Sequence, residues 1–157
     1  MKKLMTIVLA AMTTLCACAP QQVAETPMAI VFDTDLGNDV DDAVAMDMLY
    51  KYASDGKIKI LAEGISKDGL APAEYMDILN NWYGYADVPF GIILNGADCE
   101  TDAVNYAKAV NALNLEDGTP MFKRTEGMDY AALPQTHLMY REILAEAADN
   151  SVTFVTV

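Results

Sequence analysis

Positive charge is scarce in this chain. Lysine and arginine together number 10 against 23 aspartates and glutamates, which leaves a formal net charge of −13 over 157 residues. A surface of that sign repels phosphate backbones, so nucleic-acid polymers are not expected as partners. The charge instead favours metal cations or neutral small molecules.

Cysteine and histidine are rarer still. Two of the three cysteines, Cys16 and Cys18, lie close to the N-terminus, so Cys99 is the only thiol left for a mature domain. A single thiol cannot form an internal disulfide. The one histidine, His137, stands near the start of a predicted helix, where we expect a surface residue rather than a catalytic acid.

The N-terminal apolar run is too short to cross a bilayer. Residues 1–3 are Met-Lys-Lys, and an apolar segment, Leu4–Leu15, follows them, as in a secretory signal peptide. The next residues, Leu15-Cys16-Ala17-Cys18, resemble a bacterial lipobox, whose last cysteine receives the lipid. We therefore expect a signal peptide over residues 1–17 and a lipid anchor on Cys18.

The leader implies a place outside the cytoplasm, at the periplasmic or outer surface of a bacterial membrane. An ordinary secretory signal cut near Ala19 is the alternative. Residues 18–27 are then a polar tether, and residues 28–157 form the folded part.

The folded part reads as alternating strands and helices. With 53% apolar and 21% charged residues, the chain can bury a sizeable core, which excludes disorder. Strands separated by helices of this length predict an α/β fold with an open, mostly parallel sheet. The expected strands are 28–32, 58–65, 89–94 and 152–157, and the expected helices are 39–52, 72–83, 101–113 and 138–148.

Apolar spacing and turn residues set these boundaries. In the first helix, Val40, Val44 and Met48 share one face, which predicts the buried face. Residues 116–133 are rich in loop formers, and Lys123-Arg124 within them is expected to be solvated. The aromatic residues Trp82 and Tyr83 at the end of the second helix favour core packing over stacking on a ligand.

One segment carries the candidate chemistry, at the junction of the first strand and helix. Five carboxylates fall within ten residues, Asp33, Asp35, Asp39, Asp41 and Asp42, and no lysine or arginine occurs between Lys3 and Lys51. Carboxylates this close repel one another unless a cation joins them. The carboxyl edge of a parallel sheet is also where open α/β folds place their sites.

Three other interpretations of these acids differ in how many of them they explain. Helix capping explains Asp39, Asp41 and Asp42 but neither Asp33 nor Asp35. An EF-hand loop starting at Asp33 needs an acid where Val44 stands. A haloacid-dehalogenase phosphatase, in which a strand ends in Asp-x-Asp, fits Asp33 and Asp35 and stays as an alternative.

The segment Ile30–Ala43 resembles the signature of the inosine-uridine nucleoside hydrolase family, a strand followed by Asp-x-Asp-Pro-Gly-x-Asp-Asp-Ala. Leu36 replaces the proline, and two extra residues precede the paired acids. The resemblance implies a Ca²⁺-dependent hydrolase that cleaves N-glycosidic bonds in nucleosides or related ribosides. Its oligomeric state, a homo-oligomer included, stays open.

The resemblance also implies a role for each acid. Asp35 matches the calcium ligand and general base, Asp42 the bidentate calcium ligand, and Asp41 the ribose contact, with Asp39 as a rival for either later role. The family has a further calcium ligand, a backbone carbonyl, whose nearest counterpart here is Val157. Later ligands of the family lie beyond this sequence, so we expect a truncated chain that is inactive alone. A non-catalytic, calcium- or sugar-binding surface lipoprotein is the alternative.

Overall fold

The computed structural model describes residues 26–94 and 105–157. The predicted signal peptide over residues 1–17, Cys18, most of the tether and Cys99 lie outside the described residues. The first residues of the helix expected over 101–113 lie outside them too.

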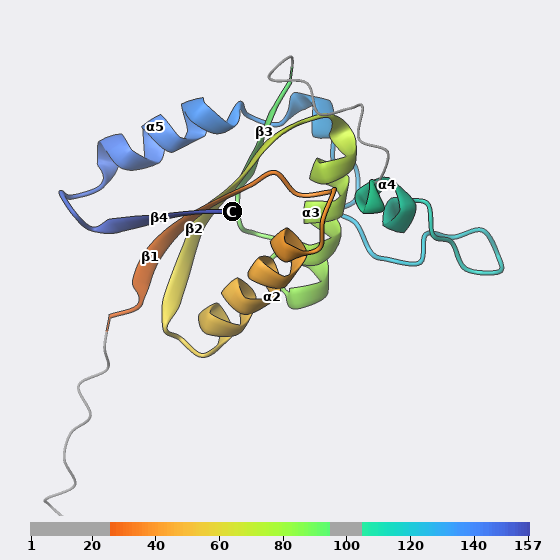
Figure 1. The fold of residues 1–157 in the computed structure, drawn as a ribbon, viewed down its shortest axis with the longest axis horizontal. Helices are drawn as coiled ribbons and strands as arrows, with labels where there is room; N and C mark the ends of the chain where they lie inside the picture. The colour runs from red at the N-terminus through yellow and green to blue at the C-terminus, as the bar shows by residue number, and fades with distance from the viewer. Residues whose placement is uncertain (1–25, 95–104) are drawn as a thin grey trace, which may run out of the picture.

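A four-stranded parallel sheet forms the centre of the molecule (Figure 1). The strands are β1 (Met28–Thr34), β2 (Ile58–Asp68), β3 (Phe90–Ile93) and β4 (Val152–Thr156), and their order across the sheet is β3-β2-β1-β4. β1 is central, because Ile30 pairs with Ile60 of β2 on one side and with Thr153 of β4 on the other. The open α/β fold with a parallel sheet is therefore confirmed.

Helices cover both faces of the sheet (Figure 1). α2 (Asp41–Ser54) and α3 (Leu70–Tyr83) lie on one face, α5 (Thr136–Glu146) lies on the other, and α4 (Tyr106–Asn111) packs beside α3. A single 3₁₀ turn, η1 (Tyr130–Ala132), interrupts the loop between α4 and α5. No helix among the described residues is long and apolar enough to cross a membrane.

The core lies between the sheet and the layer formed by α2 and α3. Ile30 and Phe32 of β1 pack there with Met46 and Leu49 of α2 and Met76 of α3, all buried. Successive side chains of a strand point to opposite faces of the sheet, so Ile30 and Phe32 of β1 face the same layer. Two strands extend further than predicted at their carboxyl ends, β1 to Thr34 and β2 to Asp68, whereas β3 and β4 each end one residue earlier than predicted.

The predicted buried face of α2 is wrong. Val40, Val44 and Met48 are 69%, 54% and 53% exposed, whereas Met46 and Tyr50 are buried. The helix is rotated so that its buried side packs with residues of β1 and β2, while Val44 is exposed and Met48 lines a groove together with Val155 of β4. Among the described residues, no further strand pairs with the outer side of β4, so this apolar face is left partly open.

Candidate functional site

The acidic segment forms a loop at the carboxyl end of β1 and the first turn of α2. Leu36 is fully buried and anchors the loop, and the amide of Tyr106 in α4 donates to the carbonyl of Gly37 at 3.0 Å. Gly37 has φ of +134°, a conformation that residues with a side chain rarely adopt. The loop is therefore held by the packing of Leu36 in the core and by the hydrogen bond from α4 to Gly37.

Three carboxylates converge in this loop. One oxygen each from Asp39, Asp41 and Asp42 lies within 4.8 Å of the others. Asp39 and Asp41 are exposed, whereas Asp42 is only 2% exposed. The group therefore opens toward solvent and has a buried carboxylate at its base.

Asp42 is oriented by the last residue of β1. The hydroxyl of Thr34 donates to Oδ1 of Asp42 at 2.5 Å and accepts from the amide of Leu36 at 3.2 Å. Thr34 is fully buried, so the strand end, the loop and the helix share one buried polar contact. This contact fixes Asp42 before any ligand arrives.

The surroundings of Asp42 disfavour its charged form. Burial raises the pKa of Asp42, and the hydrogen bond from Thr34 only partly offsets that effect. The carboxylates of Asp35, Asp41 and Asp39 raise this pKa further, in that order. Oxygen-only donors that repel one another are the donor set that suits a hard divalent cation such as Ca²⁺.

Helix capping does not explain these acids. The N-cap residue of α2 is Val40, and no side chain caps the helix. Asp41 and Asp42 lie in the first turn, where the helix dipole favours acids, but that gain is small, about 0.3–1 kcal/mol each. Burying Asp42 therefore needs another reason.

Asp35 and Asp33 occupy different surroundings. Asp35 is exposed and lies outside the group of three oxygens, although its charge acts on Asp42 more strongly than those of Asp41 and Asp39. Asp33 is half-buried and accepts a hydrogen bond from the hydroxyl of Tyr140 in α5 at 2.6 Å. Asp33 therefore ties α5 to β1, which counts against its use as a phosphatase nucleophile.

Val157 lies just beyond β4. Its amide donates to the carbonyl of Asp33 at 3.1 Å, and its side chain lines an apolar groove beside α2. Its suggested role as a carbonyl ligand stays a prediction. His137 is exposed on α5, as expected for a surface residue.

Three residues near the site were not singled out from the sequence. Thr34 orients Asp42, and the ammonium of buried Lys67 donates to the side-chain carbonyl of Asn38 in the acidic loop. The hydroxyl of Tyr106 is buried, has no hydrogen-bond partner among the described residues, and has a pKa raised first by burial and then by Asp42. Only Thr34, a polar residue ending an apolar strand, carried a signal in the sequence.

Two expectations about other residues are corrected. Arg124 is not solvated, because its Nε donates to Oε1 of Glu74 at 2.6 Å. Trp82 is 70% exposed and meets Phe122 edge-on, since it lies on the outer side of α3. Tyr83 is more exposed than expected but stacks on buried Tyr50, with the ring centroids 4.6 Å apart.

The fold and site define an α/β protein with an acidic cluster at the carboxyl edge of its central strand. No protein-family model matches the chain. No curated protein sequence matches it either.

A solved structure does share its fold. The type III effector protein XopQ, crystallised in complex with adenosine diphosphate ribose, matches with a TM-score of 0.57 and 16% identity over 84% of this chain. The match covers 36% of the XopQ chain, so this chain spans about a third of that length. The likeness shows that the two chains share an α/β fold, while membership of the nucleoside hydrolase family stays a prediction.

Proposed function

We propose that this chain belongs to a Ca²⁺-dependent hydrolase that cleaves the N-glycosidic bond of a nucleoside or related riboside. The observation that carries the proposal is the convergence of Asp39, Asp41 and Asp42 at the carboxyl end of β1. The fold likeness to XopQ, which was crystallised with a riboside, supports the same class of ligand.

The donor set fits the cation. Asp42 would hold Ca²⁺ at the base of the group of three carboxylates. The family resemblance implies Asp35, which lies outside that group, and the carbonyl of Val157 as further ligands. The charge repulsion at Asp42 is what a cation would relieve. When bound, the cation would acidify a water molecule and offset the negative charge of the site.

The side chains of the loop supply the remaining roles. Asp35 is exposed, so its carboxylate can accept a proton from an attacking water. Asp41 and Asp39 are exposed above Asp42 and can accept hydrogen bonds from the hydroxyls of ribose. Thr34 keeps Asp42 in one orientation, which positions the site in advance.

Calcium titration of the longest protein that contains this sequence tests the metal site. Asp42→Asn should weaken Ca²⁺ binding by roughly tenfold or more, because it removes a charged ligand. The same change should leave the metal-free protein about 1 kcal/mol more stable, because it relieves repulsion around a buried carboxylate. Asp87→Asn is the matched control, an exposed acid outside the site, and should change neither value.

Two results would contradict the proposal. Equal calcium affinity of the wild-type protein and Asp42→Asn would show that Asp42 is not a calcium ligand. The second result concerns catalysis. If the longest protein that contains this sequence binds calcium but releases ribose from no nucleoside of a panel, a non-catalytic binding protein becomes the better description.

We also propose that Cys18 carries a lipid that holds the protein at a bacterial membrane surface. The support is the lipobox-like sequence Leu15-Cys16-Ala17-Cys18. Acyl labelling of the wild-type protein, lost in Cys18→Ser, is the expected result.

A further inference from the structure

A buried hydroxyl beside the acidic segment lacks a hydrogen-bond partner. It belongs to Tyr106, the first residue of α4, and no residue that the structure describes accepts from it or donates to it. The ring packs against the core and meets Tyr75 of α3 edge-on, with the centroids 5.5 Å apart. Phenylalanine would make the same ring contacts, so packing does not explain the hydroxyl. Because a buried polar group without a partner destabilises a protein, this hydroxyl needs another explanation.

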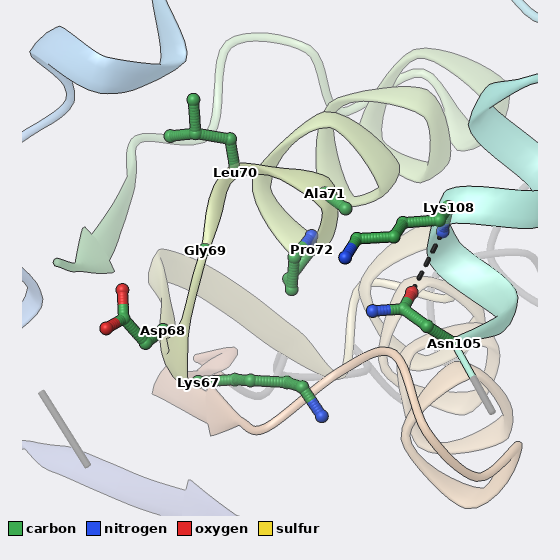
Figure 2. Close-up of a pocket in the computed structure, with 8 residues that line it drawn as sticks. All are labelled: Lys67, Asp68, Gly69, Leu70, Ala71, Pro72, Asn105 and Lys108. Atoms are coloured by element: carbon green, nitrogen blue, oxygen red, sulfur yellow. Dashed lines mark hydrogen bonds between the residues drawn. The ribbon is translucent and has the colours of Figure 1, made fainter. Parts of the chain in front are cut away.

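The start of α4 is fixed against the acidic segment. The side chain of Asn105 caps this helix by accepting from the amide of Lys108 at 2.9 Å (Figure 2). The amide of Tyr106 donates to the carbonyl of Gly37 at 3.0 Å, and a Cβ added to Gly37 would lie 3.5 Å from the Cβ of Ala107. These contacts set the position of Tyr106 next to the segment that carries the acids.

Two carboxylates of the acidic group act on the hydroxyl of Tyr106. Burial raises the pKa of Tyr106 most, and the carboxylates of Asp42 and Asp39 raise it further. The backbone of Gly37 lowers the same pKa. Electrostatic effects weaken with distance, so the hydroxyl faces the acidic segment. The raised pKa keeps the phenol protonated, and a protonated phenol is a hydrogen-bond donor.

Asp42 has room for a second donor. Thr34 donates to Oδ1 of Asp42, and an ionised carboxylate can accept several hydrogen bonds. Burial and the neighbouring acids disfavour the charge on Asp42. A bound cation would offset that repulsion and keep the carboxylate ionised. Hydrogen bonds to an ionised acceptor are stronger than those to a neutral one, so the cation would favour a bond from a nearby hydroxyl.

We propose that Tyr106 is a positioning residue of the acidic site, whose hydroxyl donates a hydrogen bond to the carboxylate of Asp42 when a divalent cation is bound. The cation itself rests on the proposed function, whereas the choice of residue rests on the buried hydroxyl. Thr34 and Tyr106 then hold Asp42 from β1 and from α4. Carboxylates that bind metals are commonly held by such donors, and loss of a donor weakens metal binding.

Calcium titration and chemical denaturation of Tyr106→Phe test this role in the longest protein that contains the sequence. The variant should bind Ca²⁺ roughly tenfold more weakly, because Asp42 loses a charge-assisted hydrogen bond. Without calcium the variant should be at least as stable as the wild-type protein, because the change removes a buried hydroxyl that has no partner. A residue with a merely structural role would not weaken calcium binding while leaving stability intact.

Tyr130→Phe is the matched control. The hydroxyl of Tyr130 lies in partly buried surroundings as well, but it already donates to Asp77 at 2.8 Å. Its removal should lower the free energy of unfolding and leave the calcium affinity unchanged.

Carbon-13 NMR of labelled tyrosine gives a direct readout. The ring signal that is missing in Tyr106→Phe should shift when Ca²⁺ is added to the wild-type protein. The same signal should shift much less in Asp42→Asn at the same calcium concentration. A signal that ignores calcium in the wild-type protein, although calcium binds, would overturn the positioning role.

The remaining contrary results can be told apart. Equal calcium affinity of the wild-type protein and Tyr106→Phe would overturn the positioning role and leave the proposed function in place. A loss of stability in calcium-free Tyr106→Phe as large as that in Tyr130→Phe would make the hydroxyl structural and overturn the role as well. No calcium binding by the wild-type protein would overturn the proposed function, and the role of Tyr106 with it.

Discussion

Buried carboxylates illustrate how single residues behave in this molecule. Asp42 lies at the base of an acidic group that would attract a cation, whereas Glu63 of β2 is fully buried in the core. Oε2 of Glu63 accepts from Asn80 at 2.7 Å, Asn80 accepts from the hydroxyl of Tyr50 at 2.9 Å, and Oε1 has no partner among the described residues. Burial raises the pKa of Glu63 to about 7.

Glu63 makes the stability of the protein depend on pH. Its pKa lies near 7 in the folded state and at 4.5 as its ordinary value, so the folded state holds the proton more tightly. The stabilisation is complete below pH 4.5 and is lost as the pH rises through 7, by on the order of 3 kcal/mol. In Glu63→Gln this loss should disappear, so chemical denaturation at pH 5 and pH 8 should give similar free energies of unfolding for the variant. An equally steep loss in the variant would mean that another group titrates.

At the scale of elements, a buried carboxylate on α3 holds a loop that is distant in sequence. Asp77 of α3 is buried and accepts hydrogen bonds from the amide and hydroxyl of Thr125, the hydroxyl of Tyr130 and the side chain of Asn81. The long segment after α4, which has little regular structure, is therefore anchored at its middle. Thr125 and Tyr130 lie 48 and 53 residues from Asp77 in the sequence, so no local pattern revealed these contacts.

Asp77→Asn should release this segment. An amide group offers one acceptor oxygen where the carboxylate offers two, so some of the four donors lose their partner at a cost of about 2–3 kcal/mol. Faster hydrogen exchange at the amide of Thr125 should accompany the loss of stability. The exposed Glu116→Gln, in the same segment, is the control for charge alone. Exchange that is unchanged in Asp77→Asn would show that the segment is held by its apolar contacts.

Gly64 of β2 has no side chain, and this allows α5 to pack closely on the sheet. A Cβ added to Gly64 of β2 would lie 1.6 Å from the hydroxyl of Tyr140, the same hydroxyl that donates to Asp33. Glycine at this position therefore lets α5 approach the sheet closely. The contact links β1, β2 and α5 at the edge that carries the site.

For the whole molecule, the distribution of apolar surface is uneven. A groove of about 610 Å³, open to solvent, runs between α2 and β4 and is lined only by apolar and aromatic residues, among them Ala45, Met48, Val155 and Val157. The outward rotation of α2 creates it, together with the position of β4 at the edge of the sheet. An apolar groove beside an edge strand favours association between molecules.

Met48→Lys should reduce that association. The lysine places a charge in the groove, so binding of a dye that detects apolar surface should fall, and light scattering at high protein concentration should fall with it. Leu144→Lys on α5 changes a side chain of similar exposure on the opposite face of the sheet and should have a smaller effect. Equal effects of the two variants would mean that net charge, rather than the groove, controls association.

The sequence by itself determined the features that depend on neighbouring residues. Apolar runs and turn residues predicted the order of strands and helices, and the parallel sheet follows from that order. Asp39, Asp41 and Asp42 lie within four positions at a strand-to-helix junction, so their convergence was also predictable.

Only the tertiary structure decided which side of each element is buried and which distant residues meet. The rotation of α2 depends on the strands against which it packs, so Val44 and Met48 are exposed although their spacing predicts a core face. Asp33 and Asp35 look equivalent in the sequence, but Tyr140, which lies 107 residues after Asp33, gives Asp33 a structural role. These outcomes arise from packing between elements, which local hydrophobic patterns do not encode.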